Sequence, residues 1–168
     1  TIRPVVFYDA RKTKPFGRLP QFLELHPCKT PGFSCHHSKA YCIVTRKAIR
    51  LVVGSFNLTY TGLFRNREVL QEWTWQSAKS ADTHILVEWM TFLREHYMTE
   101  AQASSQSALA AALATLDART SSWRLPPPAP EKPGHLLTSG YGERSGLDAL
   151  VDQWNAWFPG QVPSSLFA

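Results

Sequence analysis

Four polar side chains flank an apolar stretch of the chain, and their types could act together on one substrate. His37 and Lys39 belong to the segment HSK, and Ser55 and Asn57 belong to the segment GSFN. Residues two apart on a strand face the same way, so each pair can share a face where the backbone is extended. An imidazole, an ammonium, a hydroxyl and a carboxamide directed at one place suit a phosphodiester, whose oxygens need donors while a nucleophile attacks.

His37 is the candidate nucleophile, because an imidazole nitrogen can attack phosphorus and leave again by way of a phosphohistidine. Lys39 would neutralise charge on the phosphoryl oxygens, and Asn57 and Ser55 would donate neutral hydrogen bonds to them. A nucleophilic imidazole keeps one nitrogen free while an acceptor holds the other. Glu68, at the start of the next apolar run, is the candidate acceptor. Each residue alone is more often a solvated or satisfied polar side chain, so the inference rests on the combination.

Two alternatives concern the residues just before the lysine. His36 could replace His37 as the reactive imidazole, but the alternation in H-x-K places His36 on the opposite face. Cys35, His36 and His37 could also hold a metal, although no C-x-x-C or H-x-x-x-H spacing supports such a site. The cysteines suit a reducing compartment, since Cys28, Cys35 and Cys42 do not make a disulfide framework.

Strands are predicted where short apolar or aromatic runs are bounded by turn residues. Around the polar pairs the pattern is strand, turn, strand, with Arg46 and Lys47 in the turn. The predicted strands cover residues 2–8, 40–45, 49–54, 68–75 and 134–139, and residues 22–25 form a short helix or strand.

Helical spacing of apolar residues recurs in the second half of the chain. The predicted helices cover residues 81–97, 101–117 and 147–158. Ser80 or Asp82 is expected to cap the first of them, and Trp73, Trp75 and Trp89 are expected in the core. This order of elements predicts an α/β fold with a mixed or mostly parallel sheet flanked by helices.

A proline-rich stretch, PPPAPEKP, divides the chain, because prolines continue neither a helix nor a strand ladder. We predict that residues 1–124 form most of a first unit that carries both polar pairs. Residues 125–134 form a linker, and residues 135–168 form the opening strand and helix of a second, truncated unit.

The charge of the chain is unevenly placed. The 168 residues carry a net charge of +5, yet the first fifty hold ten Lys and Arg against only Asp9 and Glu24. A basic half that leads into the candidate site favours an anionic substrate such as nucleic acid, although a solvated basic surface gives the same count. An apolar fraction of 43% with six Trp excludes a disordered chain, and no apolar run is long enough to span a membrane.

The motif H-x-K followed by G-S-x-N resembles that of the phospholipase D superfamily. Its commonest form has an Asp where this chain has Val44. Loss of that Asp, together with the double histidine in CHHSKAYCIV, is similar to the tyrosyl-DNA phosphodiesterase 1 branch. The segments IRPVVFYDARK and HLLTSGYGERSGLDAL also resemble parts of that branch, the second being the opening of its second half.

The resemblance implies a phospholipase D-like mixed sheet with the start of a second similar unit. It implies a metal-independent hydrolase without cofactor that opens 3′-phosphotyrosyl or related DNA-end phosphodiesters and serves DNA repair. His37 would be the nucleophile, Lys39 and Asn57 would bind the phosphate with Ser55 nearby, and Glu68 would hold the histidine. The expected location is intracellular, in the nucleus of a eukaryote or the cytoplasm of a bacterium.

The family builds its site from two H-x-K motifs, and the second histidine is the general acid. No other histidine here is followed two residues later by lysine; these are His26, His36, His84, His96 and His135. The chain therefore holds half of a site and is expected to be inactive alone. Either it is a fragment of a longer enzyme, or two copies pair. The alternatives are a homodimeric nuclease or phospholipase of the superfamily, and a non-catalytic half-domain that binds nucleic acid.

Overall fold

The computed structural model describes residues 5–9, 24–28, 39–55, 57, 59–97, 103–125 and 146–162. The predicted nucleophile His37, its rival His36 and the metal alternative with Cys35 lie outside the described residues. So do the predicted strand at 134–139 and the linker at 125–134, apart from Leu125.

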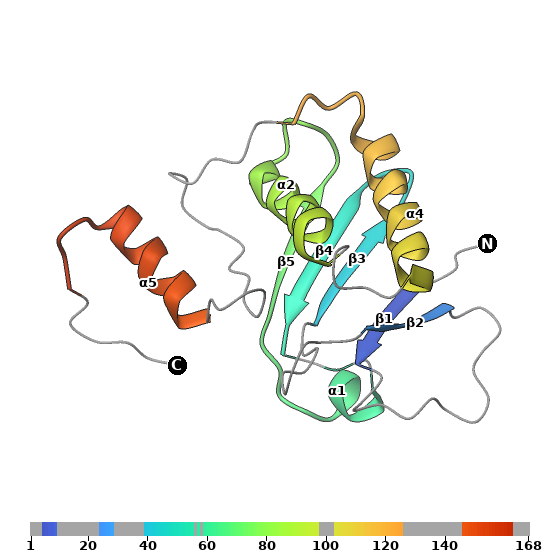
Figure 1. Cartoon of the computed structure of the whole chain (residues 1–168), viewed down its shortest axis with the longest axis horizontal. Helices are drawn as coiled ribbons and strands as arrows, with labels where there is room; N and C mark the ends of the chain where they lie inside the picture. Colours follow the sequence, from blue (N-terminus) through green and yellow to red (C-terminus); the bar gives the residue numbers. More distant parts are fainter. Residues whose placement is uncertain are drawn as a thin grey trace.

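A three-stranded antiparallel sheet stands at the centre of the described structure (Figure 1). It consists of β3 (Ala40–Val44), β4 (Ile49–Gly54) and β5 (Leu70–Trp75), in the order β3-β4-β5. The hairpin between β3 and β4 turns where Arg46 and Lys47 stand, as predicted. Thr45 closes this turn, since its backbone N–H donates to the carbonyl of Ala48 and its hydroxyl does the same, both at 2.9 Å.

A second, smaller sheet pairs β1 (Val5–Asp9) with β2 (Glu24–Cys28) in parallel. The predicted α/β class is confirmed at this coarse level. The expectation of a single mixed or mostly parallel sheet differs from what is observed, because the described strands form one parallel and one antiparallel sheet. For β3 and β4 the direction follows from the tight turn between them, since such a turn can join only strands that run in opposite directions. The longer connection through α1 joins β4 and β5, which also pair antiparallel.

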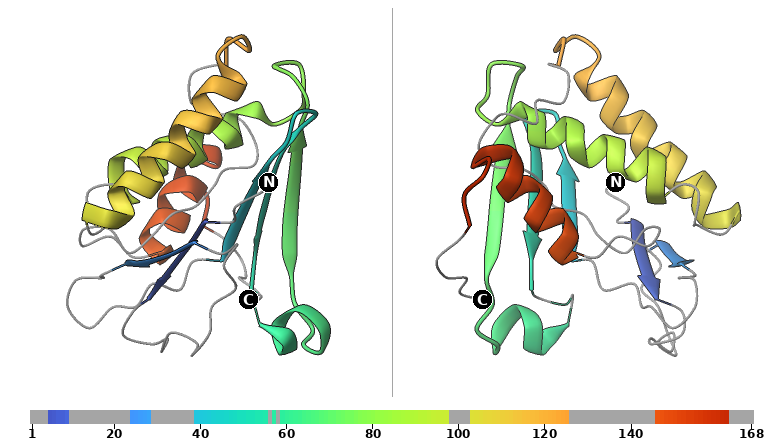
Figure 2. Two further views of the ribbon diagram at one scale, coloured as in Figure 1. Left: turned by 90° about the vertical axis from the view of Figure 1, so that its right-hand side faces the viewer. Right: turned by 60° about the vertical axis from the view of Figure 1, so that its left-hand side comes forward.

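Helices α2 (Thr83–Phe92) and α4 (Ala103–Thr120) lie on the same side of the β3-β4-β5 sheet (Figure 2). In chain order α2 runs into η1 (Leu93–Tyr97), a short π-helical segment that takes up the end of the predicted 81–97 helix. Helix α4 is tied to both sheets. Ser105 donates to the carbonyl of Pro27 in β2 at 2.8 Å, and Arg119 donates to the carbonyls of Thr45 and Arg46 in the β3–β4 turn.

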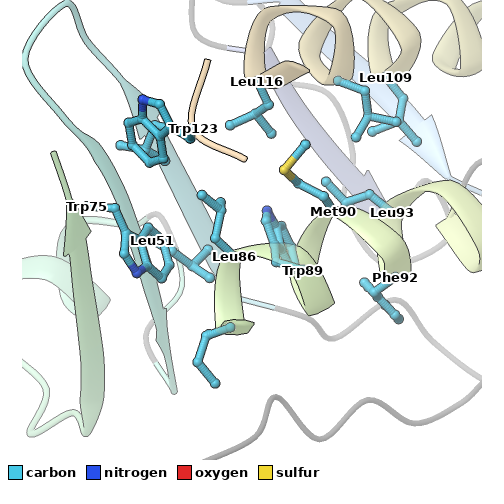
Figure 3. Packing of buried hydrophobic residues seen from close by; sticks show 13 residues of the cluster. Leu51, Trp75, Leu86, Trp89, Met90, Phe92, Leu93, Leu109, Leu116 and Trp123 are labelled. Atoms are coloured by element: carbon cyan, nitrogen blue, oxygen red, sulfur yellow. The ribbon is translucent and has the colours of Figure 1, made fainter. Parts of the chain in front are cut away.

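The core lies between the sheet and these helices. Leu51 and Trp75 of the sheet face Leu86 and Trp89 of α2 (Figure 3), which confirms the core positions predicted for Trp75 and Trp89. Trp73 is partly buried and packs against the same cluster. The buried members are Ile49, Leu51, Trp75, Ile85, Leu86, Trp89, Met90, Phe92, Leu93, Leu109, Leu113, Leu116 and Trp123.

The predicted capping of α2 is wrong. Asp82 stands at the N-cap position, but its backbone is left-handed, with φ 56°, and its side chain makes no capping hydrogen bond. A capping side chain requires an extended backbone at this position. The hydroxyl of Ser80 instead accepts hydrogen bonds from the backbone N–H groups of Gln76 and Ser77 and closes the loop before the helix.

Two helices remain. α1 (Tyr60–Phe64) is a single short helix between β4 and β5 that the sequence did not predict, and α5 (Gly146–Trp157) corresponds to the predicted helix at 147–158. Within α5 and its C-terminal turn, the rings of Trp154 and Phe158 lie 4.7 Å apart. None of the helices in the described part of the chain is long and apolar enough to cross a membrane.

Candidate phosphodiester site

One end of the antiparallel sheet collects most of the residues predicted to do chemistry. β3 begins, β4 ends and β5 begins at this end, next to α1 (Figure 1). The backbone N–H of Gly54 donates to the carbonyl of Lys39 at 3.1 Å, and that of Ser55 donates to the carbonyl of Val69 at 3.0 Å. Lys39, Ser55 and the segment with Glu68 therefore belong to three chain segments aligned by the sheet register.

Ser55 and Glu68 are joined by a short hydrogen bond at this end. The Ser55 hydroxyl donates to Oε2 of Glu68 at 2.5 Å and accepts from the backbone N–H of Val69 at 3.1 Å. A serine hydroxyl has one hydrogen to donate, and here it is directed to the Glu68 carboxylate. The predicted role of Ser55 as a donor to phosphate stays a prediction, and it requires Ser55 to release Glu68.

Glu68 is held as a carboxylate. Its pKa is lowered chiefly by the hydrogen bond from Ser55, then by the one from Asn66, against a smaller opposing effect of desolvation. The amide of Asn66 donates to Oε1 at 3.0 Å. The positive charge of Lys39 lowers the pKa further, which puts the ammonium within electrostatic reach of the carboxylate. An ionised carboxylate only accepts hydrogen bonds, so Glu68 suits the predicted role of accepting an imidazole N–H.

Asn57 is positioned by the short helix that follows it. Thr59 is the N-cap of α1, and its hydroxyl accepts the N–H of Gly62 at 3.1 Å. The N–H of Thr59 donates to the carbonyl of Asn57 at 2.7 Å. A Cβ at position 62 would come within 2.4 Å of that carbonyl oxygen. Only glycine fits there, so α1 packs directly against the Asn57 backbone. Asn57 itself is exposed.

Sequence reasoning missed three contributors to this site: Asn66, Thr59 and Gly62. Thr59 is a favoured N-cap residue type, but the Glu or Gln of a capping box does not follow at position 62, so the signal for α1 is weak. The role of Asn66 has no comparable signal, because it depends on the turn that ends α1. There the N–H groups of Arg65 and Asn66 both donate to the carbonyl of Thr61, at 2.9 and 2.8 Å.

The described part of the site supplies a fixed carboxylate, an ammonium and an exposed carboxamide. An ammonium and a carboxamide can bind phosphoryl oxygens, and the carboxylate can orient a cationic or N–H-bearing group beside them. Among the described residues, no three His, Cys, Asp or Glu side chains lie together as a metal would require.

The comparisons with known proteins returned no match: no family model, no curated protein and no solved structure is similar to this chain at a significant level.

Proposed function

We propose that this chain carries half of the active site of a metal-independent phosphodiesterase of the tyrosyl-DNA phosphodiesterase type, within a phospholipase D-like fold. The observation that carries the proposal is the arrangement at the sheet end. Ser55 and Asn66 donate hydrogen bonds to the Glu68 carboxylate, and the positive charge of Lys39 lowers its pKa. Asn57 and Ser55 both come just after β4. The H-x-K motif leads directly into β3 at this end.

In the proposed reaction, His37 attacks the phosphorus of a 3′-phosphodiester and forms a phosphohistidine, while the bond to the leaving oxygen breaks. Lys39 and Asn57 bind the non-bridging oxygens, and Glu68 accepts the other N–H of the imidazole. Water then attacks the same phosphorus, which breaks the N–P bond, frees the strand with a 3′-phosphate end and regenerates the histidine. The leaving oxygen needs a proton, and a second half-site must deliver it.

The second half-site comes from a further unit of a longer chain or from a second copy of this one. The first case makes a tyrosyl-DNA phosphodiesterase-like enzyme with one substrate channel, and the second makes a homodimer. Mass in solution separates them: a stable monomer at working concentration contradicts the homodimer, and a dimer favours it.

A leaving group that departs without being protonated tests the half-site in this chain alone. With an oligonucleotide 3′-(4-nitrophenyl) phosphate in EDTA, we expect a single burst of 4-nitrophenolate and the oligonucleotide joined to His37 through its 3′-phosphate. Mass spectrometry under alkaline conditions detects this adduct. His37→Ala should abolish both signals, and Asn57→Ala should slow the burst by about 10²-fold or more, as for loss of a donor to a reacting oxygen.

His36→Ala is the matched control, since it removes the neighbouring imidazole and should leave the burst intact. Absence of an adduct on His37, or a burst that survives His37→Ala unchanged, contradicts the proposed function. A burst that disappears in EDTA and returns with a divalent metal contradicts the metal-independent mechanism.

A further inference from the structure

Large apolar side chains are exposed immediately beside the candidate site. Phe64, the last residue of α1, is 73% exposed, and Val69, whose backbone is bonded to Ser55, is 80% exposed. Exposed side chains of this size can add apolar contact area to a bound partner. Both belong to residues 64–69, which we call the rim segment.

The rim segment is also basic. Arg65 and Arg67 are exposed, and Glu68 is the only acidic residue between positions 57 and 71. The Glu68 carboxylate is engaged with Ser55 and Asn66. Together with Lys39 at the same end of the sheet, these described residues carry a net positive charge, and a polyanion is the complementary partner.

The rim segment is held in shape without a ligand. At its start, the N–H groups of Arg65 and Asn66 bond to α1. In its middle, the Asn66 side chain bonds to Glu68, and at its end the Val69 N–H bonds to Ser55. A segment anchored at both ends pays less ordering entropy on binding than a free loop, so it can serve as a preformed surface.

We propose that the rim segment binds the nucleotides of a single strand next to the reacting phosphate. In this role Phe64 stacks on a base, and Arg65 and Arg67 bind flanking phosphates. Aromatic stacking beside cations is how single strands are bound without sequence preference, and guanidinium groups match individual phosphates in a bidentate manner. The inference rests on the proposed function for the identity of the reacting group, but strand binding can be measured without any reaction.

The arginines are tested by fluorescence anisotropy of the 168-residue chain with a labelled single-stranded oligonucleotide across a salt series. Arg65→Ala/Arg67→Ala should weaken binding. It should also reduce the slope of log affinity against log salt by about 1.4, the value for two phosphate contacts on a single strand. Lys47→Ala/Lys79→Ala removes the same charge from exposed positions at the opposite end of the sheet and should leave both quantities near those of the parent chain.

The phenylalanine is tested with a second probe. Phe64→Ala should lose about 5-fold or more in affinity for the base-bearing strand, as expected for one stacked base. It should lose nothing for an abasic strand of equal length, whose phosphates remain. Unfolding midpoints of all variants show whether the fold is kept, and Phe64→Tyr should retain the stacking.

The outcomes separate this inference from the proposed function. Equal losses for the arginine and lysine pairs, no binding by the parent chain, or tighter binding to phosphatidylserine vesicles than to the strand each overturn the role of the rim segment. Strand binding that depends on Arg65 and Arg67, with no adduct on His37, supports the rim segment and contradicts the phosphodiesterase.

Discussion

At the scale of single residues, the site depends on where one hydrogen lies. The Ser55 hydroxyl donates a hydrogen bond to Glu68 and accepts one from the Val69 N–H, so the serine links a carboxylate to the sheet. The motif alone assigns Ser55 to phosphate binding. In the structure Ser55 holds the Glu68 carboxylate in position. The two roles can be separated by their effect on Glu68.

Ser55→Ala should raise the pKa of Glu68, because it removes the largest of the interactions that lower it. The measurement is an NMR titration of the Glu68 side-chain carboxyl carbon in the parent and variant chains. Ser80→Ala, which removes a serine hydroxyl from the loop at the other end of the sheet, is the control and should leave the titration unchanged. An equal titration in the Ser55 variant would show that the hydrogen bond is not formed in solution.

Glu68 should also make stability depend on pH. Its pKa is lowered in the folded chain from the ordinary value of 4.5, so the unfolded state binds the proton more readily. The contribution is therefore complete above that ordinary value and is lost as the pH falls through the lowered pKa. Glu68→Gln should be less stable than the parent in urea at neutral pH, and the two curves should converge in acid. A difference that is the same at both pH values would contradict this linkage.

At the scale of elements, α1 packs closely against the backbone of Asn57 and fixes its position. The strands around it follow from the sequence, because their alternation and turn residues are local. α1 does not, since five residues are too few for a helical period to show. The missing capping hydrogen bond at Asp82 could not be predicted either. The left-handed backbone of Asp82 is set by the loop before α2, and residue type alone does not reveal it.

Gly62→Ala tests this close packing of α1 against Asn57. Alanine normally stabilises a helix relative to glycine by about 1 kcal/mol. Here the added methyl would meet the carbonyl of Asn57, so we expect a loss of about 1–3 kcal/mol in unfolding free energy, as for overpacking. The burst with the 4-nitrophenyl substrate should slow as well.

Gly160→Ala is the companion variant. Gly160 has a positive φ of 75° with nothing near its missing side chain, so alanine there strains the backbone only. It should cost stability without slowing the burst. If Gly62→Ala is neutral or stabilising, the close approach of α1 to Asn57 is wrong.

At the scale of the whole molecule, one core supports both the sheet and the helices α2 and α4. That Trp75 and Trp89 would be buried follows from the sequence, because apolar residues recur on matching faces of a strand and a helix. The separation of the strands into two sheets does not, since pairing between β1 and β2 joins segments that share no local signal. For the site, the motif predicts that Lys39 and Ser55 lie together with Glu68 nearby. The hydrogen bond between Ser55 and Glu68 was not predicted, because it depends on the pairing of separate strands and has no local signal.

Leu86→Ala should test how far this core supports the site. Leu86 is fully buried, and removal of such a side chain costs about 2–5 kcal/mol in the free energy of unfolding. Leu70→Ala, at a half-exposed position of β5, should cost much less. Denaturation by urea measures both, and similar losses would contradict the described core.

The pairing between β4 and β5 has a consequence for how accurately the two strands align when the chain folds. One alignment sets Ile49 against Trp75 in the core and brings Ser55 beside Val69, one residue from Glu68. A slip of one residue would turn Trp75 out to water and would carry Glu68 away from its serine. A misaligned chain therefore loses both the burial of Trp75 and the contact between Glu68 and Ser55. The burial of this tryptophan thus stabilises the one alignment that places the carboxylate correctly at the far end of the same strand pair.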